Sequence, residues 1–151
     1  MFNKASVGGT FNVLHKGHRY ILKVAFTIAE RVVVGLTTDT FANRFRSEKV
    51  LPYKKREEEL RSFLSTFSKP FEIVEINDAY GPATLDPELD CLVVSEETLL
   101  RGEEINAIRF KKGLEKLILV VVPIVLAEDG HAISGERIAR GEIDREGRVL
   151  E

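Results

Sequence analysis

Residues 7–18 read V-G-G-T-F-N-V-L-H-K-G-H, and the interpretation of the whole chain starts from this stretch. A short apolar segment ends in Gly8 and Gly9, a tight turn follows, and His15 and His18 flank the start of a helical pattern. Free backbone N–H groups and the positive end of a helix dipole meet at such a start, and both attract anions. The stretch therefore predicts a phosphate-binding turn between a strand and a helix.

The position of His18 favours a role in a site. His18 lies three residues before Ile21, on the apolar stripe of the expected helix and in its first turn. A capping or core histidine would give the same pattern, but the adjoining glycines, threonine and His15 favour a functional residue. A zinc site would need further ligands, and the remaining histidine, His131, falls in an expected loop. The stretch matches neither a Walker loop nor a dinucleotide-binding loop.

Composition sets the broad class of the protein. A length of 151 residues with 44% hydrophobic residues suits one globular domain, here residues 1–151. The formal net charge of −2 argues against a general nucleic-acid or membrane partner. Cys91, the sole cysteine, lies in an apolar run and is expected to be buried and unreactive. The sequence shows no signal peptide, so the cytoplasm is the expected location, and 30% charged residues without Gln or Trp suggest a thermophile.

The apolar pattern alternates between strand-like and helix-like segments. Strands are expected at residues 4–9, 32–37, 71–76, 91–94 and 117–122, and helices at 17–29, from Pro52 to before Pro70, from about 96 to 113, and at 134–140. This order predicts a Rossmann-like, doubly wound, mostly parallel five-stranded α/β sheet with helices on both faces. Ligands of such sheets bind beyond the carboxyl ends of the strands, where each helix begins.

Two further segments bring charged residues to that edge. Arg56 lies on the apolar face of its helix near the start, so it should point inward and need an anionic partner. Lys49 precedes it in an expected loop at residues 38–50. Near the other end of the chain, Ser134 can cap a short helix with Arg137 in its first turn. This gives a second helix start that carries a cation.

These motifs resemble a known superfamily. The segments G-G-T-F-N-V-L-H-K-G-H at 8–18 and I-S-G-E-R-I at 133–138 are similar to nucleotidyltransferases with a T/H-x-G-H motif and an I-S-S-T-x-I-type motif. Further segments resemble the archaeal and eukaryotic phosphopantetheine adenylyltransferases: G-L-T-T-D at 35–39, L-P-Y-K-K-R at 51–56, V-S-E-E-T at 94–98, I-N-A-I-R at 105–109 and R-G-E-I-D-R-E-G at 140–147.

The resemblance implies a reaction in which ATP and 4′-phosphopantetheine give dephospho-coenzyme A and pyrophosphate. Mg²⁺ would arrive with ATP, because it prefers phosphate oxygens and water to a cage of protein ligands, and no metal site of the protein is expected. The attacking phosphate oxygen is already ionised near neutral pH, so positioning and charge stabilisation are the main requirements. The implied partners are small molecules, with no nucleic acid or membrane among them.

The resemblance also implies roles for individual residues. His18 would be the catalytic residue, with His15 assisting. The implied ATP-binding residues are Gly9, Thr10, Phe11, His15, His18, Arg109, Ser134, Gly135 and Arg137. The implied residues for the acceptor phosphate are Thr10, Lys49 and Arg56.

The sequence departs from the family at Gly135 and Glu136, where relatives usually carry hydroxyl residues. Glu136 would repel phosphate unless it turns outward or helps to hold magnesium through water. Asn12 stands where cytidylyltransferases often carry Asp, which favours the adenylyltransferase branch. A sister transferase acting on nicotinamide mononucleotide or a cytidine nucleotide, and a non-catalytic nucleotide-binding module, remain as alternatives. All of these interpretations require the starts of the first and last helices to lie close together.

Overall fold

The computed structural model describes residues 1–44 and 49–151. Its elements are β1 (Phe2–Gly9), α1 (Lys16–Ile28), β2 (Ala29–Thr37), α2 (Asp39–Asn43), α3 (Tyr53–Leu64), β3 (Phe71–Ile76), the 3-10 helix η1 (Gly81–Thr84), β4 (Cys91–Ser95), α4 (Leu99–Lys111), β5 (Ile118–Val122) and α5 (Gly135–Ala139). All five expected strands and four expected helices are present. Residues 45–48, part of the expected loop at 38–50, lie outside the described residues.

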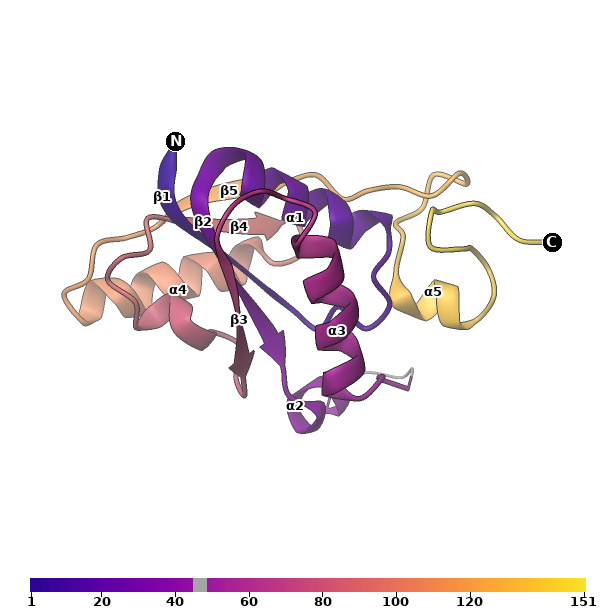
Figure 1. Cartoon of the computed structure of the whole chain (residues 1–151), viewed down its shortest axis with the longest axis horizontal. Helices are drawn as coiled ribbons and strands as arrows, with labels where there is room; N and C mark the ends of the chain where they lie inside the picture. Colours follow the sequence, from indigo (N-terminus) through magenta and orange to yellow (C-terminus); the bar gives the residue numbers. More distant parts are fainter. Residues whose placement is uncertain (45–48) are drawn as a thin grey trace.

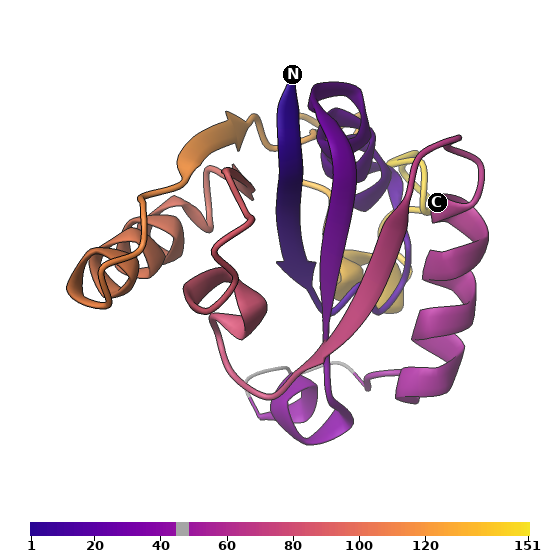
Figure 2. The same ribbon diagram turned by 60° about the vertical axis from the view of Figure 1, so that its left-hand side comes forward.

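The strands form one five-stranded sheet in the order β3-β2-β1-β4-β5, with every neighbouring pair parallel (Figures 1 and 2). The first strand is therefore central, and the chain winds outward first on one side and then on the other. Gly8 lies opposite Gly35 in the register of β1 and β2. The predicted Rossmann-like fold is confirmed, and the sheet is wholly parallel.

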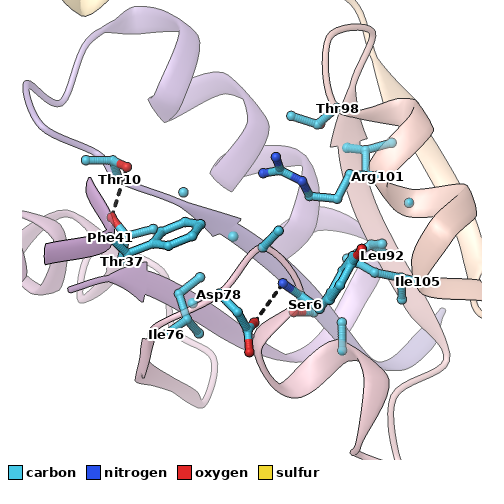
Figure 3. A pocket seen from close by; sticks show the side chains of 18 of the residues that line it. Ser6, Thr10, Thr37, Phe41, Ile76, Asp78, Leu92, Thr98, Arg101 and Ile105 are labelled. Atoms are coloured by element: carbon cyan, nitrogen blue, oxygen red, sulfur yellow. Dashed lines mark hydrogen bonds between the residues drawn. The ribbon is translucent and has the colours of Figure 1, made fainter. Parts of the chain in front are cut away.

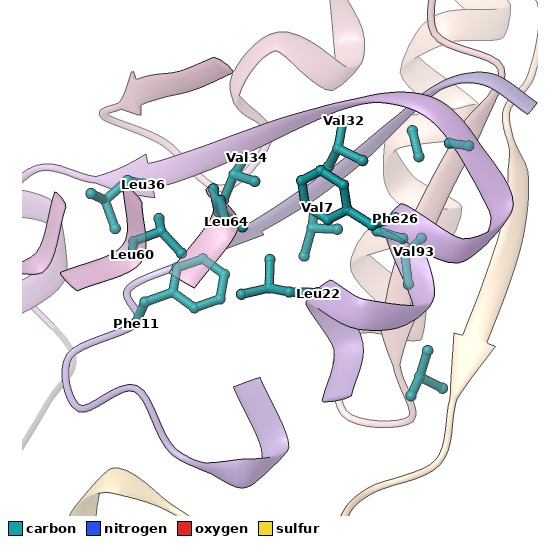
Figure 4. Close-up of a cluster of buried hydrophobic side chains, with 14 of the residues drawn as sticks. Val7, Phe11, Leu22, Phe26, Val32, Val34, Leu36, Leu60, Leu64 and Val93 are labelled. Carbon is teal, nitrogen blue, oxygen red and sulfur yellow. The ribbon is translucent and has the colours of Figure 1, made fainter. Parts of the chain in front are cut away.

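The main core fills one face of the sheet. Helices α1 and α3 pack there against alternate residues of β1, β2 and β4 (Figure 4). Its buried members include Val7, Leu22, Phe26, Val32, Val34, Leu60, Leu64 and Val93. Cys91 belongs to the same cluster, which confirms its expected burial, and that burial raises the pKa of its thiol to about 12.

Helix α4 covers the opposite face at β4 and β5, where Ile105 packs against Leu92 and Val94 in a second cluster. The same face of β1 and β2 presents Ser6, Gly8 and Gly35 to a cavity instead of to a helix. The helices thus lie on both faces, as predicted, but they cover the two faces to different extents. Among the described helices, none is long and apolar enough to cross a membrane.

The structure differs from the sequence interpretation in one element near the cavity. Helix α2 occupies five residues of the expected loop, and the Thr38 hydroxyl caps it by accepting the Phe41 N–H at 3.2 Å. A segment this short cannot show helical periodicity in its apolar residues, so a capping threonine was its one sign in the sequence.

Candidate active site

A cavity of about 820 Å³ lies at the carboxyl edge of the sheet (Figure 3). Its floor is formed by the ends of the central strands, and its walls come from α2, η1, α4 and the start of α5. Four of the predicted ATP-binding residues line it, Gly9, Thr10, Ser134 and Gly135, together with Glu136. The turn after β1 and the start of α5, which are far apart in sequence, therefore meet at one cavity.

The start of α1 is capped by the imidazole of His15. Its Nδ1 atom accepts the N–H groups of Gly17 at 3.0 Å and His18 at 3.3 Å. Gly17 is required because a Cβ at that position would lie 2.9 Å from Cε1 of the same imidazole. The K-G-H part of the motif thus leaves room for the histidine that precedes it to fold over the helix start.

His15 is 6% exposed, and its pKa is lowered to about 4 by burial and, to a smaller extent, by the nearby charge of Arg19. The ring is therefore neutral at physiological pH. Because Nδ1 accepts two backbone N–H groups, the proton of the neutral ring resides on Nε2. His15 can supply an N–H donor, but it adds no positive charge against its neighbour.

That neighbour is His18, whose ring stacks on the ring of His15 with 3.7 Å between centroids. Nδ1 of His18 lies 3.1 Å from the carbonyl oxygen of Val13 and 3.4 Å from the backbone nitrogen of His15. The main chain thus fixes one side of the ring, and Nε2 is directed away from those atoms. His18 is half-buried at the start of α1; neither histidine is among the described residues that line the cavity.

Phe11 has a role that the sequence did not indicate. Its backbone φ is 46°, a left-handed conformation that is costly for an aromatic residue, and its ring is only 4% exposed. The ring contacts His18 edge-on, and a Cβ at position 9 would lie 3.0 Å from it, which explains Gly9. The side chain of Phe11 therefore supports His18 from the core, and its backbone is the part at the turn.

The turn after β1 is anchored by two polar side chains. The Thr37 hydroxyl donates to Oγ1 of Thr10 at 2.9 Å, which leaves the Thr10 O–H as a donor toward the cavity. Asn12 accepts the Leu51 N–H at 2.7 Å and donates its amide to the Lys49 carbonyl at 3.2 Å. An aspartate could not make the second bond, so the asparagine holds the segment that follows the undescribed residues. The side chain of Lys49 itself is exposed and does not line the cavity.

Arg56 points inward as expected, but its anionic partner belongs to the protein. The guanidinium is 1% exposed and pairs with Asp39 at 2.8 Å. It also donates to three carbonyl oxygens, those of Leu51, Thr10 and Thr37. With these bonds made, Arg56 fixes the strand ends and α2 around the cavity and has no exposed face for a phosphate.

Arg109 is not placed at the cavity. It lies in the last turn of α4, and its guanidinium, which is 0% exposed, donates to the carbonyl oxygens of Ala83, Asp86 and Glu115. The last turn of a helix that follows a strand lies away from the carboxyl edge, which is the physical reason for this position. The described contacts of Arg109 are those of a structural residue.

The start of α5 is assembled by ionic contacts. The Ser134 hydroxyl accepts the Arg137 N–H at 3.2 Å, as a helix cap does. The Arg137 guanidinium pairs with Asp129 and, at 3.2 Å, with Glu142, and it donates to the Ala132 carbonyl. The charge of Arg137 is thus neutralised by the surrounding segment, and it holds the loop before α5 in shape.

Residues 123–151, which we call the C-terminal segment, dock on the start of α1 (Figure 1). The Lys16 N–H donates to the Arg145 carbonyl at 2.9 Å, and Arg19 pairs with Glu146. Glu59 of α3 accepts both the Arg145 guanidinium and the Leu14 N–H, each at 3.1 Å. These contacts hold the segment that contains α5 against the start of α1.

Glu136 lines the cavity and pairs with Arg140 at 3.3 Å, so its charge is partly compensated. Within residues 1–44 and 49–151, no group of three or more His, Cys, Asp or Glu side chains is arranged to hold a metal ion. Sequence reasoning missed Arg101, which lies in the first turn of α4 and extends into the cavity (Figure 3).

Comparisons with known proteins identify the family of the chain. The family model described as cytidylyltransferase-like matches residues 6–141. A phosphopantetheine adenylyltransferase from Methanopyrus kandleri is 43% identical over 145 residues, which cover 95% of this chain and 92% of that protein. Another from Methanothermobacter thermautotrophicus is 38% identical and covers 99% and 90% of the two chains. A crystal structure of an Archaeoglobus fulgidus protein of unknown function matches with a TM-score of 0.72 and 35% identity, covering 79% of this chain and 88% of that one.

The fold, the cavity and the H-x-G-H turn together define a nucleotidyltransferase of the cytidylyltransferase-like family, to which the chain belongs. The extent and identity of the curated matches narrow the assignment further. Within that family, the chain is a member of the phosphopantetheine adenylyltransferases.

Proposed function

We propose that this chain transfers the adenylyl group of ATP to the phosphate of 4′-phosphopantetheine, giving dephospho-coenzyme A and pyrophosphate. One observation carries the proposal: the turn after β1 and the start of α5 line the same cavity, and Phe11 of that turn contacts His18. The names of the relatives support the choice of acceptor.

In the proposed mechanism, an oxygen of the acceptor phosphate attacks the α-phosphorus of ATP in line with the departing pyrophosphate. The acceptor is already ionised, so the chain needs no general base. The Thr10 hydroxyl and the N–H groups of the turn hold the phosphates, and Nε2 of His18 stabilises the charge that develops on the α-phosphate. Ser134 and Gly135 bind the triphosphate from the far side. The neutral ring of His15 accepts the Gly17 and His18 N–H groups at Nδ1 and leaves its Nε2–H as a donor.

Magnesium enters this scheme as part of the MgATP substrate, because phosphate oxygens and water suit it better than a protein cage. Glu136 lies at the cavity, where its carboxylate can contact the ion through water while Arg140 limits its repulsion of phosphate. Arg56 acts indirectly in this proposal: it positions Thr10 and does not touch the substrate.

The test is release of pyrophosphate from ATP in the presence of magnesium and 4′-phosphopantetheine, with the nucleotide product identified by mass. Parallel reactions contain nicotinamide mononucleotide with ATP, or a cytidine nucleotide with a phosphorylated acceptor. Formation of dephospho-coenzyme A alone supports the proposal. Turnover in a parallel reaction without dephospho-coenzyme A would identify a sister transferase, and tight ATP binding without any product would identify a binding module.

A further inference from the structure

Strand β5 forms one edge of the sheet, and its outer side is open (orange in Figure 2). Within residues 1–44 and 49–151, β4 is the only strand that pairs with it. The strand reads I-L-V-V-V, and its side chains of Ile118 and Val121 are 57% and 42% exposed. We propose that β5 pairs with β5 of a second copy of this chain, antiparallel and about a twofold axis. This dimer does not depend on the function proposed above.

The two edges of the sheet are protected differently. Strand β3, at the opposite edge, begins directly after Pro70 and exposes Glu72 and Glu75. Charged side chains and proline are the usual means by which an edge strand avoids pairing with another chain. Strand β5 contains neither. An apolar edge without such protection is an aggregation hazard or an interface, and the open hydrogen-bonding groups of β5 favour an interface.

These open groups are few. The Ile118 N–H donates at 3.1 Å to the carbonyl oxygen of the residue before β4, so the main chain of Ile118 faces β4. Main-chain groups alternate in direction along a strand, so those of Val120 and Val122 also face β4. Leu119 and Val121 therefore direct their N–H and C=O groups outward, away from the sheet.

The residues that flank this pair do not extend the open edge. Both main-chain groups of Leu117 are bonded to the side chain of Asn106: the Leu117 N–H donates to Oδ1 at 2.7 Å, and the Asn106 amide donates to the Leu117 carbonyl at 2.9 Å. Pro123, the next outward-facing residue at the other end, has no N–H. The open edge is thus centred on Val120.

A second copy of the strand fits this edge in one register. With Val120 of both copies on the twofold axis, Leu119 of one copy lies opposite Val121 of the other, and each such pair exchanges two hydrogen bonds. The two pairs then use every outward group of both residues. A shift by two residues in either direction would place one of them opposite Leu117 or Pro123 and leave groups without a bond.

The charges near the ends of β5 are complementary in the same register. Lys116, which precedes the strand, comes opposite Ile124 of the other copy. The Ile124 N–H donates to the Glu96 carboxylate at 3.2 Å, so an anion lies beside the position that Lys116 approaches. Both charged side chains are exposed, and the twofold axis repeats the pair at the other end. No residue of β5 is among the described residues that line the cavity, so both cavities stay open.

The first experiment measures mass in solution by sedimentation over a range of protein concentrations. Val121→Pro removes an outward N–H, and with it two of the four bonds, but no bond to β4. Val121→Lys keeps the main chain and adds a charge to the edge. Glu75→Pro is the matched control: Ile76 faces β2 through its carbonyl oxygen, so the Glu75 N–H points outward at the other edge.

We expect the average mass of the wild type to rise with concentration toward twice the monomer value and no further, because pairing uses β5 of both copies. Val121→Pro and Val121→Lys should each raise the dissociation constant by at least about tenfold, and Glu75→Pro should change it by less than about twofold. Circular dichroism and melting temperature show that each variant is folded, and Val121→Lys provides the test if Val121→Pro is not.

The second experiment tests the register. In the proposed dimer the two copies of Val120 form a non-hydrogen-bonded pair with Cα atoms about 4.5 Å apart, within reach of a disulfide. The two copies of Ile118 would be four residues apart along the strands, roughly 13 Å, and out of reach. Oxidised glutathione should therefore link Val120→Cys chains at least about tenfold faster than Ile118→Cys chains, although Ile118 is more exposed. The native Cys91 is buried and unpaired.

A wild type that stays monomeric at every concentration would overturn the proposal. A dimer that persists unchanged in both folded Val121 variants would overturn it as well, because another surface would then form the contact. Association that continues beyond two chains would show an aggregating edge instead of a twofold interface. Cross-linking of Ile118→Cys as fast as that of Val120→Cys would contradict the register.

Discussion

The turn that leads into α1 lines the same cavity as the start of α5, but α1 and α5 are held in place by different forces. Helix α1 has 13 residues, buries Leu22, Ala25 and Phe26 in the main core, and is capped by a buried imidazole. Helix α5 has five residues, none of which is fully buried, and a small separate cluster of Ala127, Ile133 and Ile143 lies beside it. Its shape depends on the ion pairs of Arg137.

This difference suggests a division of work between the two helix starts. The α1 start is fixed by a close-packed core, which suits groups that must be placed accurately for the chemical step. The α5 start rests on ionic contacts that open at lower cost in free energy, which suits binding and release of a nucleotide. We therefore expect substitutions at α1 to change turnover and substitutions at α5 to change affinity.

The largest effect is expected at His18. We expect His18→Ala to lower kcat by roughly 10²–10³-fold, as when a donor to a developing charge is removed, with a smaller change in ATP affinity. Steady-state kinetics with a separate measurement of ATP binding checks this. Equal losses in kcat and in ATP affinity would mean that His18 only binds ATP. The proposed assignment of α1 to turnover and of α5 to affinity would then be wrong.

The second effect concerns stability and the neutral cap. Because the folded-state pKa of His15 is about 4 and the unfolded value is 6.5, the unfolded chain binds an extra proton between these values, so stability falls as pH falls. From pH 7 to 4.5 we expect this group to cost roughly 2–3 kcal/mol of the free energy of unfolding.

Urea unfolding at several pH values measures this loss. His15→Asn keeps a side-chain acceptor for the helix cap but cannot titrate, so its stability should depend less on pH over the same range. His131→Asn, at an exposed position, is the matched control and should follow the wild type. Parallel curves for wild type and His15→Asn would show that proton uptake by His15 on unfolding does not cause the loss of stability at low pH.

The third effect tests the α5 start. Arg137→Met removes the ion pairs that shape this segment, and we expect the KM for ATP to rise about tenfold while kcat changes less than threefold. Arg148→Met, which removes an exposed charge from the same segment, is the control. A loss in kcat as large as that of His18→Ala would place both helix starts in the chemical step.

The smallest effect is expected where the C-terminal segment docks on α1. Glu146→Gln removes the pair with Arg19, which is partly exposed, so the KM for ATP should rise only about two- to threefold. The KM of the wild type should rise with salt, and that of the variant should rise less. Initial rates at several salt concentrations measure both, with Glu151→Gln as the control. Equal salt dependence in the two proteins would show that this ion pair does not hold the segment.

The fold was largely predictable because its signals are local. Continuous apolar runs mark the strands, and capping or turn residues such as Pro52 and Ser134 mark the helix starts. Helix α2 was not predicted, because five residues are too few to show a helical period in their apolar positions. The turn after β1 and the start of α5 line one cavity, because the alternation of strands and helices fixes the edge of the sheet at which ligand sites lie.

The arginines show where sequence reasoning stops. Arg56 was expected to need an anion, and it has one, but Asp39 lies in a helix that the sequence did not reveal. Arg109 is satisfied by carbonyl oxygens, which every residue carries and no sequence pattern marks. Arg101 lies among charged residues in the sequence, and such a pattern is typical of the solvent-exposed face of a helix. Its place in the first turn of a helix, against the dipole, was the one available signal.

The uneven cover of the sheet has a thermodynamic consequence. Gly8 and Gly35 lie side by side without side chains, with the side chain of Ile76 packed beside Gly35, so a molecule that rests on this face would touch the backbone of β1 directly at Gly8. Binding there would withdraw the inner surface of the fold from water and should appear as a negative heat-capacity change and greater resistance to melting. The ligand would then cover the part of β1 and β2 that no helix covers on this face, and the stability of these central strands would depend on whether the site is occupied.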